Sequence, residues 1–344
     1  MEIISVGLIG YGIGGSLFHA PFIPVAKGLR LTAIATSRAT EVARDFPAVR
    51  VHSGAHELIR DPGIDLVVIS TPTATHYQIA RAALEAGKHV VIDKPMAITA
   101  AEADELIELA RGRARVLSVY QNRRWDGDFR TVRRVIDQRR TGDVYYYEAH
   151  FDRFRPSIKE GWREEEGSGS GILYDLGAHL IDQALVLFGM PGAVTADVLR
   201  QRPDARSVDY FHLVLDYGRQ RVVLHASSLV REPGPHFAIH GGEGSFLKYG
   251  MDPQEDALKA GVRPGSPDWG RDNPEQFGLL VRADGAASRV ETLPGGYERY
   301  YEDMAACLLE GAPVPVNPVD SRNGLAIIEA SLRSAKERRT IEMK

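Results

Sequence analysis

Three polar residues of this sequence are of the types that alcohol oxidation requires. Lys94 lies in the segment VIDKP, where Pro95 prevents the preceding strand from continuing and fixes the turn. Asp175 and His179 lie in YDLGAHLIDQ, four positions apart, so they are neighbours on one face of a predicted helix. A histidine accepts a hydroxyl proton at neutral pH, and a lysine ammonium stabilises negative charge on an oxygen. The three residues therefore predict proton transfer at a substrate oxygen.

Each of these residues also has a purely structural interpretation. Lys94 could be a surface lysine that follows a strand, and the polar stripe of Asp175, His179 and Asp182 could be the solvated face of a helix. We interpret Asp182 as structural. Gly177 costs about 1 kcal/mol in a helix interior, and close approach of a ligand or another backbone would compensate for it. The apolar residues of the helix recur every three or four positions and predict a core-facing stripe: Leu173, Leu176, Leu180, Ala184 and Leu187.

Oxidation of an alcohol also requires a hydride acceptor, and the first residues predict a dinucleotide site. Gly10, Gly12 and Gly15 form G-x-G-x-x-G between a buried strand and a helical stretch. The first glycine permits the tight turn, the second lets the backbone approach a pyrophosphate, and the third lets helix and strand pack closely. We include Ile13 in this loop among the cofactor-binding residues. The alternative is a glycine-rich turn that binds no ligand.

The end of the second strand bears on the choice of cofactor. Strand 29–36 is followed by Ser37 and Arg38, and the nearest acid, Glu41, comes too late to bind a ribose 2′-hydroxyl. Ser37 can donate to a 2′-phosphate, and the planar guanidinium of Arg38 can pair with it. These residues favour NADP, although NAD remains possible and Arg38 could be a solvated loop residue.

The loops after the predicted strands 64–70 and 89–93 complete the predicted cofactor site. Thr71, Pro72, Thr73 and His76 belong to the segment STPTATH, at the carboxyl end of the sheet where such folds bind ligands. Lys94 lies at the same edge. An ordinary helix-capping turn is the alternative for the threonines.

The elements that carry these residues alternate strictly in the first 120 residues. Helical patterns at 74–87 and 99–112 separate buried strands, and Thr99 and Glu102 have capping-box spacing. This order predicts a parallel sheet, and we assign residues 1–121 to a Rossmann dinucleotide-binding domain. The predicted strands are 3–10, 29–36, 64–70, 89–93 and 115–120.

The remainder, residues 122–344, predicts an α+β domain with a large, mostly antiparallel open sheet. The hairpins turn at 217–220 and 241–244. Residues 251–290 are rich in Pro, Gly and Asp and are predicted to be a loop, in which 252–261 could be a lid. The expected elements are a helix at 127–140, β segments at 143–154, 193–202, 208–218, 220–230 and 236–250, and helices at 297–310 and 318–338.

Composition restricts the functional class. The 344 residues are enough for two domains, and the net charge of −4 gives no electrostatic basis for binding nucleic acid or anionic lipid. A single cysteine, Cys307, excludes an intramolecular disulfide, and we expect no metal cofactor. Without a signal peptide or a long apolar run, the expected location is the cytoplasm.

Taken together, G-x-G-x-x-G, a strand-end Lys-Pro and D-x-G-x-H resemble the Gfo/Idh/MocA oxidoreductases over essentially the whole chain. Asp93 stands where many members have Glu. The segments FHAPF, YQNRRWDGDF, FDRFRP and GILYDLGAHLIDQAL resemble the branch that contains NADP-preferring scyllo-inositol dehydrogenases.

The resemblance implies hydride transfer between nicotinamide and a hydroxyl-bearing carbon of a sugar or cyclitol. It assigns His179 as proton acceptor, Lys94 as the group that orients and polarises the oxygen, and Asp175 as a partner of a neighbouring hydroxyl. It also implies dimers or tetramers formed through the second sheet. The residue types suit a sugar site at Tyr120, Asn122, Arg123, Trp125, Asp152, Arg153, Trp162 and Arg163.

Two other functions stay open at this point. The chain could be a dinucleotide-binding sensor without turnover, although the presence of Lys94, Asp175 and His179 argues against this. It could also hold its cofactor tightly and carry out redox-neutral chemistry.

Overall fold

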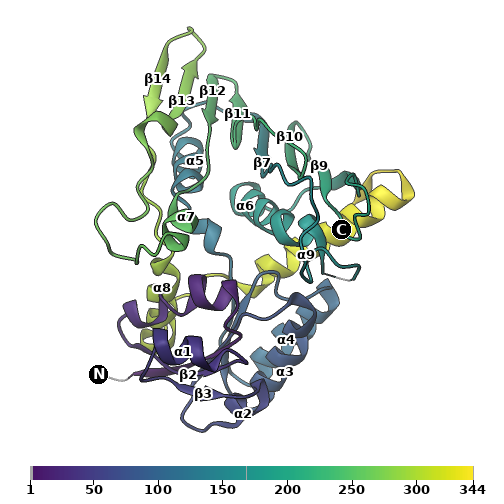
Figure 1. The fold of residues 1–344 in the computed structure, drawn as a ribbon. Helices are drawn as coiled ribbons and strands as arrows, with labels where there is room; N and C mark the ends of the chain where they lie inside the picture. Colours follow the sequence, from purple (N-terminus) through teal and green to yellow (C-terminus); the bar gives the residue numbers. More distant parts are fainter. Residues whose placement is uncertain (1–2, 168, 344) are drawn as a thin grey trace. The chain divides into compact units, whose positions relative to one another are not determined.

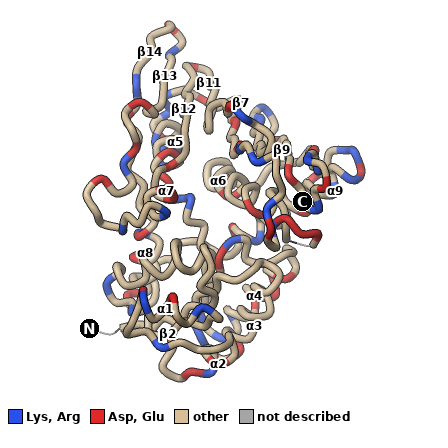
Figure 2. The backbone as a smooth tube through the Cα atoms, in the orientation of Figure 1, with Lys and Arg blue, Asp and Glu red and all other residues tan. Residues whose placement is uncertain are grey.

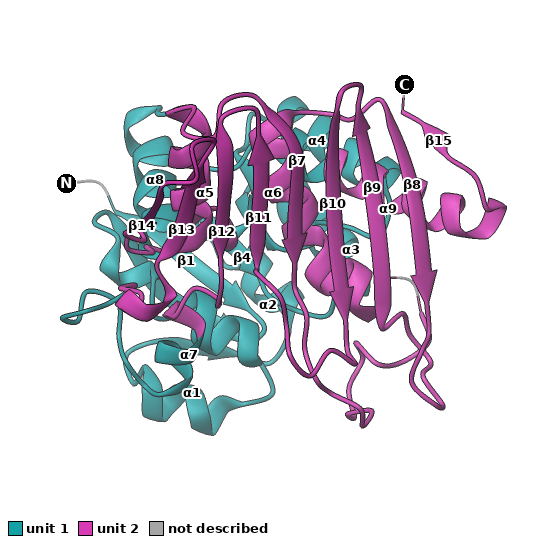
Figure 3. Cartoon of the chain, turned by 90° about the horizontal axis from the view of Figure 1, so that it is seen from above, with its two compact units in different colours: residues 1–122, 256–269, 297–322 teal, residues 123–255, 270–296, 323–344 magenta. Residues whose placement is uncertain are grey.

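The computed structural model describes residues 3–167 and 169–343, and the chain forms two compact units. Figure 3 shows them in different colours. The predicted domain boundary at residue 121 is close to the end of the first segment of unit 1, at residue 122. Two later segments of the chain also belong to that unit. Unit 1 comprises residues 1–122, 256–269 and 297–322, and unit 2 comprises residues 123–255, 270–296 and 323–344.

Unit 1 is built on a parallel sheet of six strands in the order β3-β2-β1-β4-β5-β6; Figure 1 labels β2 and β3 of this sheet. The five predicted strands are present, and β3 is an addition that the sequence did not reveal. It has three residues, none of them buried, so it lacks the apolar run that marks its neighbours. The strands are β1 Ile4–Ile9, β2 Leu29–Ala35, β3 Arg50–His52, β4 Leu66–Ile69, β5 His89–Asp93 and β6 Leu117–Tyr120.

Helices connect these strands, and their ends follow local rules. Thr99 and Glu102 form the predicted capping box at the start of α4, with both reciprocal hydrogen bonds present. Gly87 follows the last turn of α3 with φ +78°, as expected for a glycine stop. The helices of unit 1 are α1 Ala39–Asp45, α2 Ala55–Arg60, α3 His76–Glu85, α4 Ala100–Gly112 and α8 Glu298–Glu310. Short 3₁₀ turns lie at Ile23–Val25, Thr73–Thr75 and Asn122–Trp125.

Unit 2 contains a sheet of nine strands in the order β14-β13-β12-β11-β7-β10-β9-β8-β15 (Figure 3). Only β7 and β10 pair in parallel, so the sheet is mostly antiparallel as predicted, and both predicted hairpins are confirmed. The strands are β7 Val144–His150, β8 Ala193–Leu199, β9 Tyr210–Tyr217, β10 Gln220–Ser227, β11 Phe237–Gly241, β12 Gly244–Lys248, β13 Gly278–Arg282, β14 Ala287–Val290 and β15 Ile341–Glu342.

The prediction that residues 251–290 form a loop was wrong in part. The segment contains α7 Gln254–Lys259, a 3₁₀ turn at Pro274–Gln276 and the strands β13 and β14. Strand β14 exposes three of its four residues, so composition alone could not distinguish it from a loop.

The two faces of this sheet differ in burial. Tyr147, Phe211 and Phe237 are fully buried on one face, and α5 Gly127–Asp137 and α6 Ala178–Phe188 lie behind the sheet in Figure 3. We call the opposite face, which carries Glu148 and His150 of β7 with their cross-strand neighbours, the open face. Helix α9 Pro318–Glu337 begins in unit 1 and continues in unit 2.

Charged residues of both signs are interspersed along the backbone of both units (Figure 2). Within residues 3–167 and 169–343, no helix is long and apolar enough to cross a membrane.

Candidate active site

The glycine loop after β1 has two glycines that the protein's own packing requires and one that faces open space. Gly10 has φ +98°, and a Cβ there would lie 2.2 Å from the carbonyl oxygen of Ser70. A Cβ on Gly15 would lie 2.1 Å from the carbonyl oxygen of Gly10. By contrast, a Cβ on Gly12 would meet no atom of the described chain within 4 Å. The loop therefore fits a dinucleotide whose pyrophosphate approaches the backbone at Gly12.

The helical stretch after this loop is a wide, π-type helix, Gly14–His19, rather than a regular α-helix. Its last residue, His19, is fully buried. Nδ1 of His19 lies 2.6 Å from the Tyr301 hydroxyl, and Nε2 lies 3.5 Å from Oδ2 of Asp93. His19 thus connects the helical stretch after the glycine loop both to Asp93 of β5 and to Tyr301 of α8. Sequence reasoning missed both, and only the histidine of FHAPF was visible as a signal.

Asp93 fixes the backbone of Lys94 at the end of β5. Its Oδ1 accepts a hydrogen bond from the Lys94 backbone N–H at 2.8 Å, and its Oδ2 accepts one from Ser70 Oγ at 3.1 Å. Burial by itself would raise the pKa of Asp93, but the hydrogen bond and charge of His19, with the charge of Lys94, lower it below its ordinary value. Asp93 is therefore a carboxylate at neutral pH. The replacement of Glu by Asp in this motif leaves a carboxylate beside Lys94.

His76 lies in the interior of unit 1 rather than at its surface. Its Nδ1 is 2.8 Å from the carbonyl oxygen of Pro95, and its Nε2 is 2.8 Å from that of Thr71. Burial lowers the pKa of the imidazole. His76 therefore connects the loops after β4 and β5, and this geometry favours a positioning role over direct contact with the cofactor. Thr71 itself bonds through Oγ1 to Thr75 at 2.7 Å, in the turn that precedes α3.

The residues predicted to select the cofactor are exposed after β2. Ser37 and Arg38 both lie at the surface, and the Arg38 backbone N–H donates to Thr36 Oγ1 at 3.0 Å. The side chain of Ile13 is 69% exposed. These groups are thus accessible to a ligand.

Arg263 lies near Tyr11 of the glycine loop, and the sequence did not predict this. The Tyr11 hydroxyl donates to Oδ2 of Asp45 at 2.9 Å. Arg263, from the later segment 256–269 of the same unit, is close enough for its charge to contribute to lowering the pKa of Asp45, after the larger effect of the Arg44 hydrogen bond. Because Asp45 and Arg263 are far apart in the sequence, no sequence signal predicted this proximity.

In unit 2, Asp175 and His179 lie on either side of a junction between two kinds of helix. Leu173–Gly177 forms a π-type turn that continues into α6, so the helix predicted from periodicity begins with a wide turn. Oδ1 of Asp175 lies 3.4 Å from Nε of Arg163, and about a quarter of the Asp175 side chain is exposed. His179 is 6% exposed. π-type turns are frequent at functional sites.

The compensation at Gly177 is a close side chain. A Cβ there would lie 3.0 Å from Leu173 Cδ1, which is tighter than ordinary contact, and 3.4 Å from the Phe211 ring of β9, which is ordinary van der Waals contact. The structural interpretation of Asp182 is confirmed, because the buried carboxylate accepts two hydrogen bonds from Arg124, at 2.8 and 2.6 Å.

Arg153 and Trp162 lie in the neighbourhood of Asp175. Burial lowers the pKa of Arg153 to about 10, and the charge of Asp175 acts against this shift, so the two groups are close. The Arg153 guanidinium lies 4.7 Å from the centre of the Phe151 ring. The Arg163 guanidinium, which pairs with Asp175, lies 4.4 Å from the Trp162 ring. Aromatic rings and arginine donors thus lie together near Asp175.

Other residues that were predicted to bind substrate are buried inside their own unit. Tyr120 is 1% exposed, with its ring 4.4 Å from that of His19, and Asn122 is also buried. Arg123 forms ion pairs with Asp126 at 3.0 Å and Glu255 at 2.6 Å. These contacts favour structural roles.

Two further residues that were predicted to bind substrate have defined positions in unit 2. The backbone carbonyl of Trp125 accepts hydrogen bonds from Gln254 and Gly296. Asp152 lies beside His150 and His225 at the open face.

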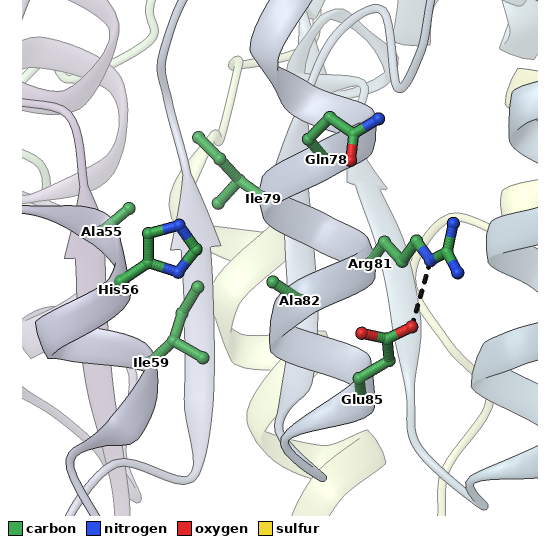
Figure 4. A pocket seen from close by; sticks show the side chains of 8 residues that line it. All are labelled: Ala55, His56, Ile59, Gln78, Ile79, Arg81, Ala82 and Glu85. Carbon is green, nitrogen blue, oxygen red and sulfur yellow. Dashed lines mark hydrogen bonds and ion pairs between the residues drawn. The ribbon is translucent and has the colours of Figure 1, made fainter.

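A surface hollow between α2 and α3 contains none of the predicted residues (Figure 4). Ile59 and Ala82 supply apolar surface, and Arg81 forms an ion pair with Glu85 at 3.0 Å at one side. Its lining comes from two helices and includes none of the loops at the carboxyl ends of the strands, so we assign it no part in cofactor binding.

Two family models match nearly the whole chain. Residues 4–121 match the NAD-binding Rossmann fold of the oxidoreductase family Gfo/Idh/MocA, and residues 133–343 match its C-terminal alpha/beta domain. The chain belongs to this family. It is an NAD(P)-dependent oxidoreductase that acts on CH–OH groups.

Several relatives resemble the chain over its full length. It is 46% identical to the scyllo-inositol 2-dehydrogenase (NADP(+)) IolW of Bacillus subtilis, covering 99% of this chain and 96% of IolW. It is also 46% identical to the uncharacterized oxidoreductase YdgJ of Escherichia coli, covering 98% of each. The solved structure of the oxidoreductase yvaA from Bacillus subtilis has a TM-score of 0.97 at 45% identity, with 100% of this chain and 99% of that chain covered.

Proposed function

We propose that this protein is an NADP-preferring dehydrogenase of a sugar or cyclitol, with a scyllo-inositol-like polyol as the favoured substrate. The observation that carries the proposal is the presence of Lys94, Asp175 and His179 in a chain that shares 46% of its residues with an NADP-linked scyllo-inositol dehydrogenase. The substrate screen below tests which sugar or cyclitol reacts, at which carbon and in which direction.

The three polar residues have distinct roles in the proposed reaction. The nicotinamide ring, when bound, accepts the hydride from the carbon that bears the hydroxyl. His179 removes the hydroxyl proton, and Asp175 binds a neighbouring hydroxyl and assists His179. Lys94 orients the reacting oxygen and stabilises its negative charge. Asp93 supports this by holding the Lys94 backbone at the end of β5.

Selection of NADP is assigned to Ser37 and Arg38. Both are exposed after β2, and no acid stands at that strand end to bind a ribose 2′-hydroxyl. A 2′-phosphate would receive a hydrogen bond from Ser37 and a planar, charge-assisted pair from Arg38. Gly10, Gly12, Ile13 and Gly15 then hold the pyrophosphate, with the loop of Thr71, Pro72 and Thr73 at the same edge of the sheet.

For the substrate, we propose that Arg153, Trp162 and Arg163 accompany Asp175. Their mutual proximity within unit 2 supports this. Tyr120, Asn122, Arg123 and Trp125 support the site through the packing of their own units. We also propose a cytoplasmic homodimer or homotetramer that associates through the open face of the nine-stranded sheet.

A substrate screen tests the proposal directly. The purified protein is incubated with NADP or NAD and a panel of inositols and hexoses, and with NADPH and the corresponding keto compounds, while NADPH absorbance is recorded. We expect NADPH formation with at least one inositol and a higher kcat/KM with NADP than with NAD. Binding of NADP without turnover on any member would indicate a sensor. Protein that purifies with cofactor bound and oxidises no polyol would indicate redox-neutral chemistry.

A further inference from the structure

Three histidines and two carboxylates gather at the open face of the unit 2 sheet, outside the residues used by the proposed reaction. His150 on β7 and His225 on β10 are direct partners in the parallel register, and His225 is in turn opposite His212 on β9. The His150 and His225 ring centres are 4.9 Å apart. Asp152 follows β7, and Glu148 precedes His150 by two residues, so its side chain shares that face.

Asp152 holds the two histidines together. Its Oδ2 lies 3.0 Å from Nδ1 of His150, and its Oδ1 lies 2.9 Å from Nδ1 of His225. The same Oδ1 accepts a hydrogen bond from the Ser227 backbone N–H at 3.0 Å, which fixes the carboxylate. One ligand atom from each of these residues lies within 4.8 Å of the other two. Tetrahedral zinc with bonds of about 2.0–2.1 Å places its ligand atoms about 3.3–3.4 Å apart. The contacts of Asp152 with the two imidazole nitrogens, at 3.0 and 2.9 Å, are close to this value.

Nδ1 of His225 has an imperfect partner. The atom is buried and lies 2.9 Å from Oδ1 of Asp152, but this contact does not meet hydrogen-bond geometry. A buried ring nitrogen with a poorly directed partner is less well stabilised than one with a full hydrogen bond. A cation bound by the nitrogen lone pair would supply a well-directed partner.

The other nitrogen of His150 already has the partner that metal-binding histidines use. Its Nε2 lies 2.7 Å from Oε1 of Glu148, and Oε2 of Glu148 accepts a hydrogen bond from the Tyr146 hydroxyl at 3.1 Å. A carboxylate on the far side of the ring fixes the ring orientation and tautomer and raises the basicity of the ligating nitrogen. Nδ1 is then the nitrogen that faces Asp152.

We propose that His150, Asp152 and His225 bind one Zn²⁺ ion at the open face of this sheet, with Glu148 orienting His150. The donor set of two imidazoles and one carboxylate is typical of zinc, and a fourth position is left for water or an added ligand. The ion links β7 to β10 and is not needed for hydride transfer. None of the ligands takes part in the catalytic roles given above, and the site lies on the open face that we propose for subunit association.

The test uses full-length protein that carries no polyhistidine tag and has been treated with EDTA and dialysed. Zn²⁺ is titrated in competition with a chromophoric chelator, on the wild type, on His150→Gln, on His225→Gln and on Glu148→Gln. His212→Gln is the matched control, because His212 shares the face and lies beside His225 but contributes no ligand atom to the cluster. We expect one Zn²⁺ per chain in the wild type and the control. Each ligand variant should bind at least about 100-fold more weakly, and Glu148→Gln about 10–100-fold more weakly.

A second measurement requires no variant. Co²⁺ added to the stripped wild type should give the intense visible absorption of four-coordinate cobalt, and Zn²⁺ should abolish it. The proposal would be overturned if the wild type bound Zn²⁺ no more tightly than the variants His150→Gln and His225→Gln. The proposal would also be overturned if Co²⁺ added to the wild type gave no more than the weak absorption of the hydrated ion. This measurement uses the wild type alone, so it does not depend on whether a variant folds. Dehydrogenase activity is recorded separately, so loss of the zinc site and loss of the proposed function are distinguishable.

Discussion

A pair of alanine substitutions in the glycine loop should separate cofactor binding from folding. Gly12→Ala adds a methyl group where the described chain has no atom within 4 Å. Gly15→Ala adds the same methyl group 2.1 Å from the Gly10 carbonyl oxygen. Gly12 does not have positive φ, so alanine meets no backbone penalty there. The two variants therefore add the same atoms with opposite expected effects.

The magnitudes follow from what each methyl group meets. At Gly15 the clash is with backbone, which cannot rotate away, so we expect the free energy of unfolding to fall by about 3 kcal/mol, the upper end for overpacking. At Gly12 we expect a change within about 0.5 kcal/mol, as for an unconstrained position. The methyl group would, however, hold a pyrophosphate away from the backbone, and a loss of about 1.4 kcal/mol in binding weakens NADP affinity by about tenfold.

Denaturant unfolding without cofactor gives the stability of both variants, and titration with NADPH, followed by its fluorescence, gives the affinity. The reasoning would be refuted if Gly12→Ala bound NADPH as tightly as the wild type. It would also be refuted if Gly15→Ala were as stable as the wild type, because the close packing of helix and strand would then not depend on glycine.

Three further predictions concern single side chains. Arg38→Ala should raise the KM for NADP far more than the KM for NAD, since only NADP has the 2′-phosphate, and equal effects would remove Arg38 from cofactor selection. Asp182→Ala should lower the free energy of unfolding by about 3–5 kcal/mol, because it leaves the Arg124 guanidinium without the buried carboxylate that it binds twice; a change below about 1 kcal/mol in denaturant unfolding would contradict this. Burial, and after it the charge of Asp252, raises the pKa of Asp128 to about 7 from 3.8. The folded chain therefore keeps a proton that the unfolded chain releases, and the stability gained is complete below about pH 4 and is lost as the pH rises through about 7. Relative to Asp128→Asn, the wild type should lose stability between about pH 4 and pH 7, and parallel stability curves for the two proteins would contradict the shift.

Local patterns were sufficient to predict the elements that carry the chemistry. The glycine loop, the capping box at Thr99 and the Lys94–Pro95 turn each depend on residues a few positions apart, and the structure contains all three. The buried strands of unit 1 were recognisable as continuous apolar runs, since both faces of a parallel sheet are covered. The exposed strand β14 and the three-residue β3 have no such run, which is why they were missed.

Contacts between distant parts of the sequence could not be predicted. His19 meets Tyr301 across 282 residues, and His150 meets His225 only because β7 and β10 pair in parallel. Periodicity alone indicated a regular helix at Leu173–Gly177, where the structure has a π-type turn. The histidine neighbours of Asp152, from β7 and β10, were not predicted from the sequence, and substrate binding by Asp152 stays a prediction.

The most direct test of the central claim is turnover by His179→Ala. The rate of NADPH formation from the polyol that the wild type oxidises, with NADP affinity measured on the same preparation, isolates the proton-accepting step. We expect turnover about 10²–10⁴-fold below that of the wild type, with NADP affinity unchanged. Wild-type turnover in His179→Ala would contradict the assignment of His179 as the proton acceptor.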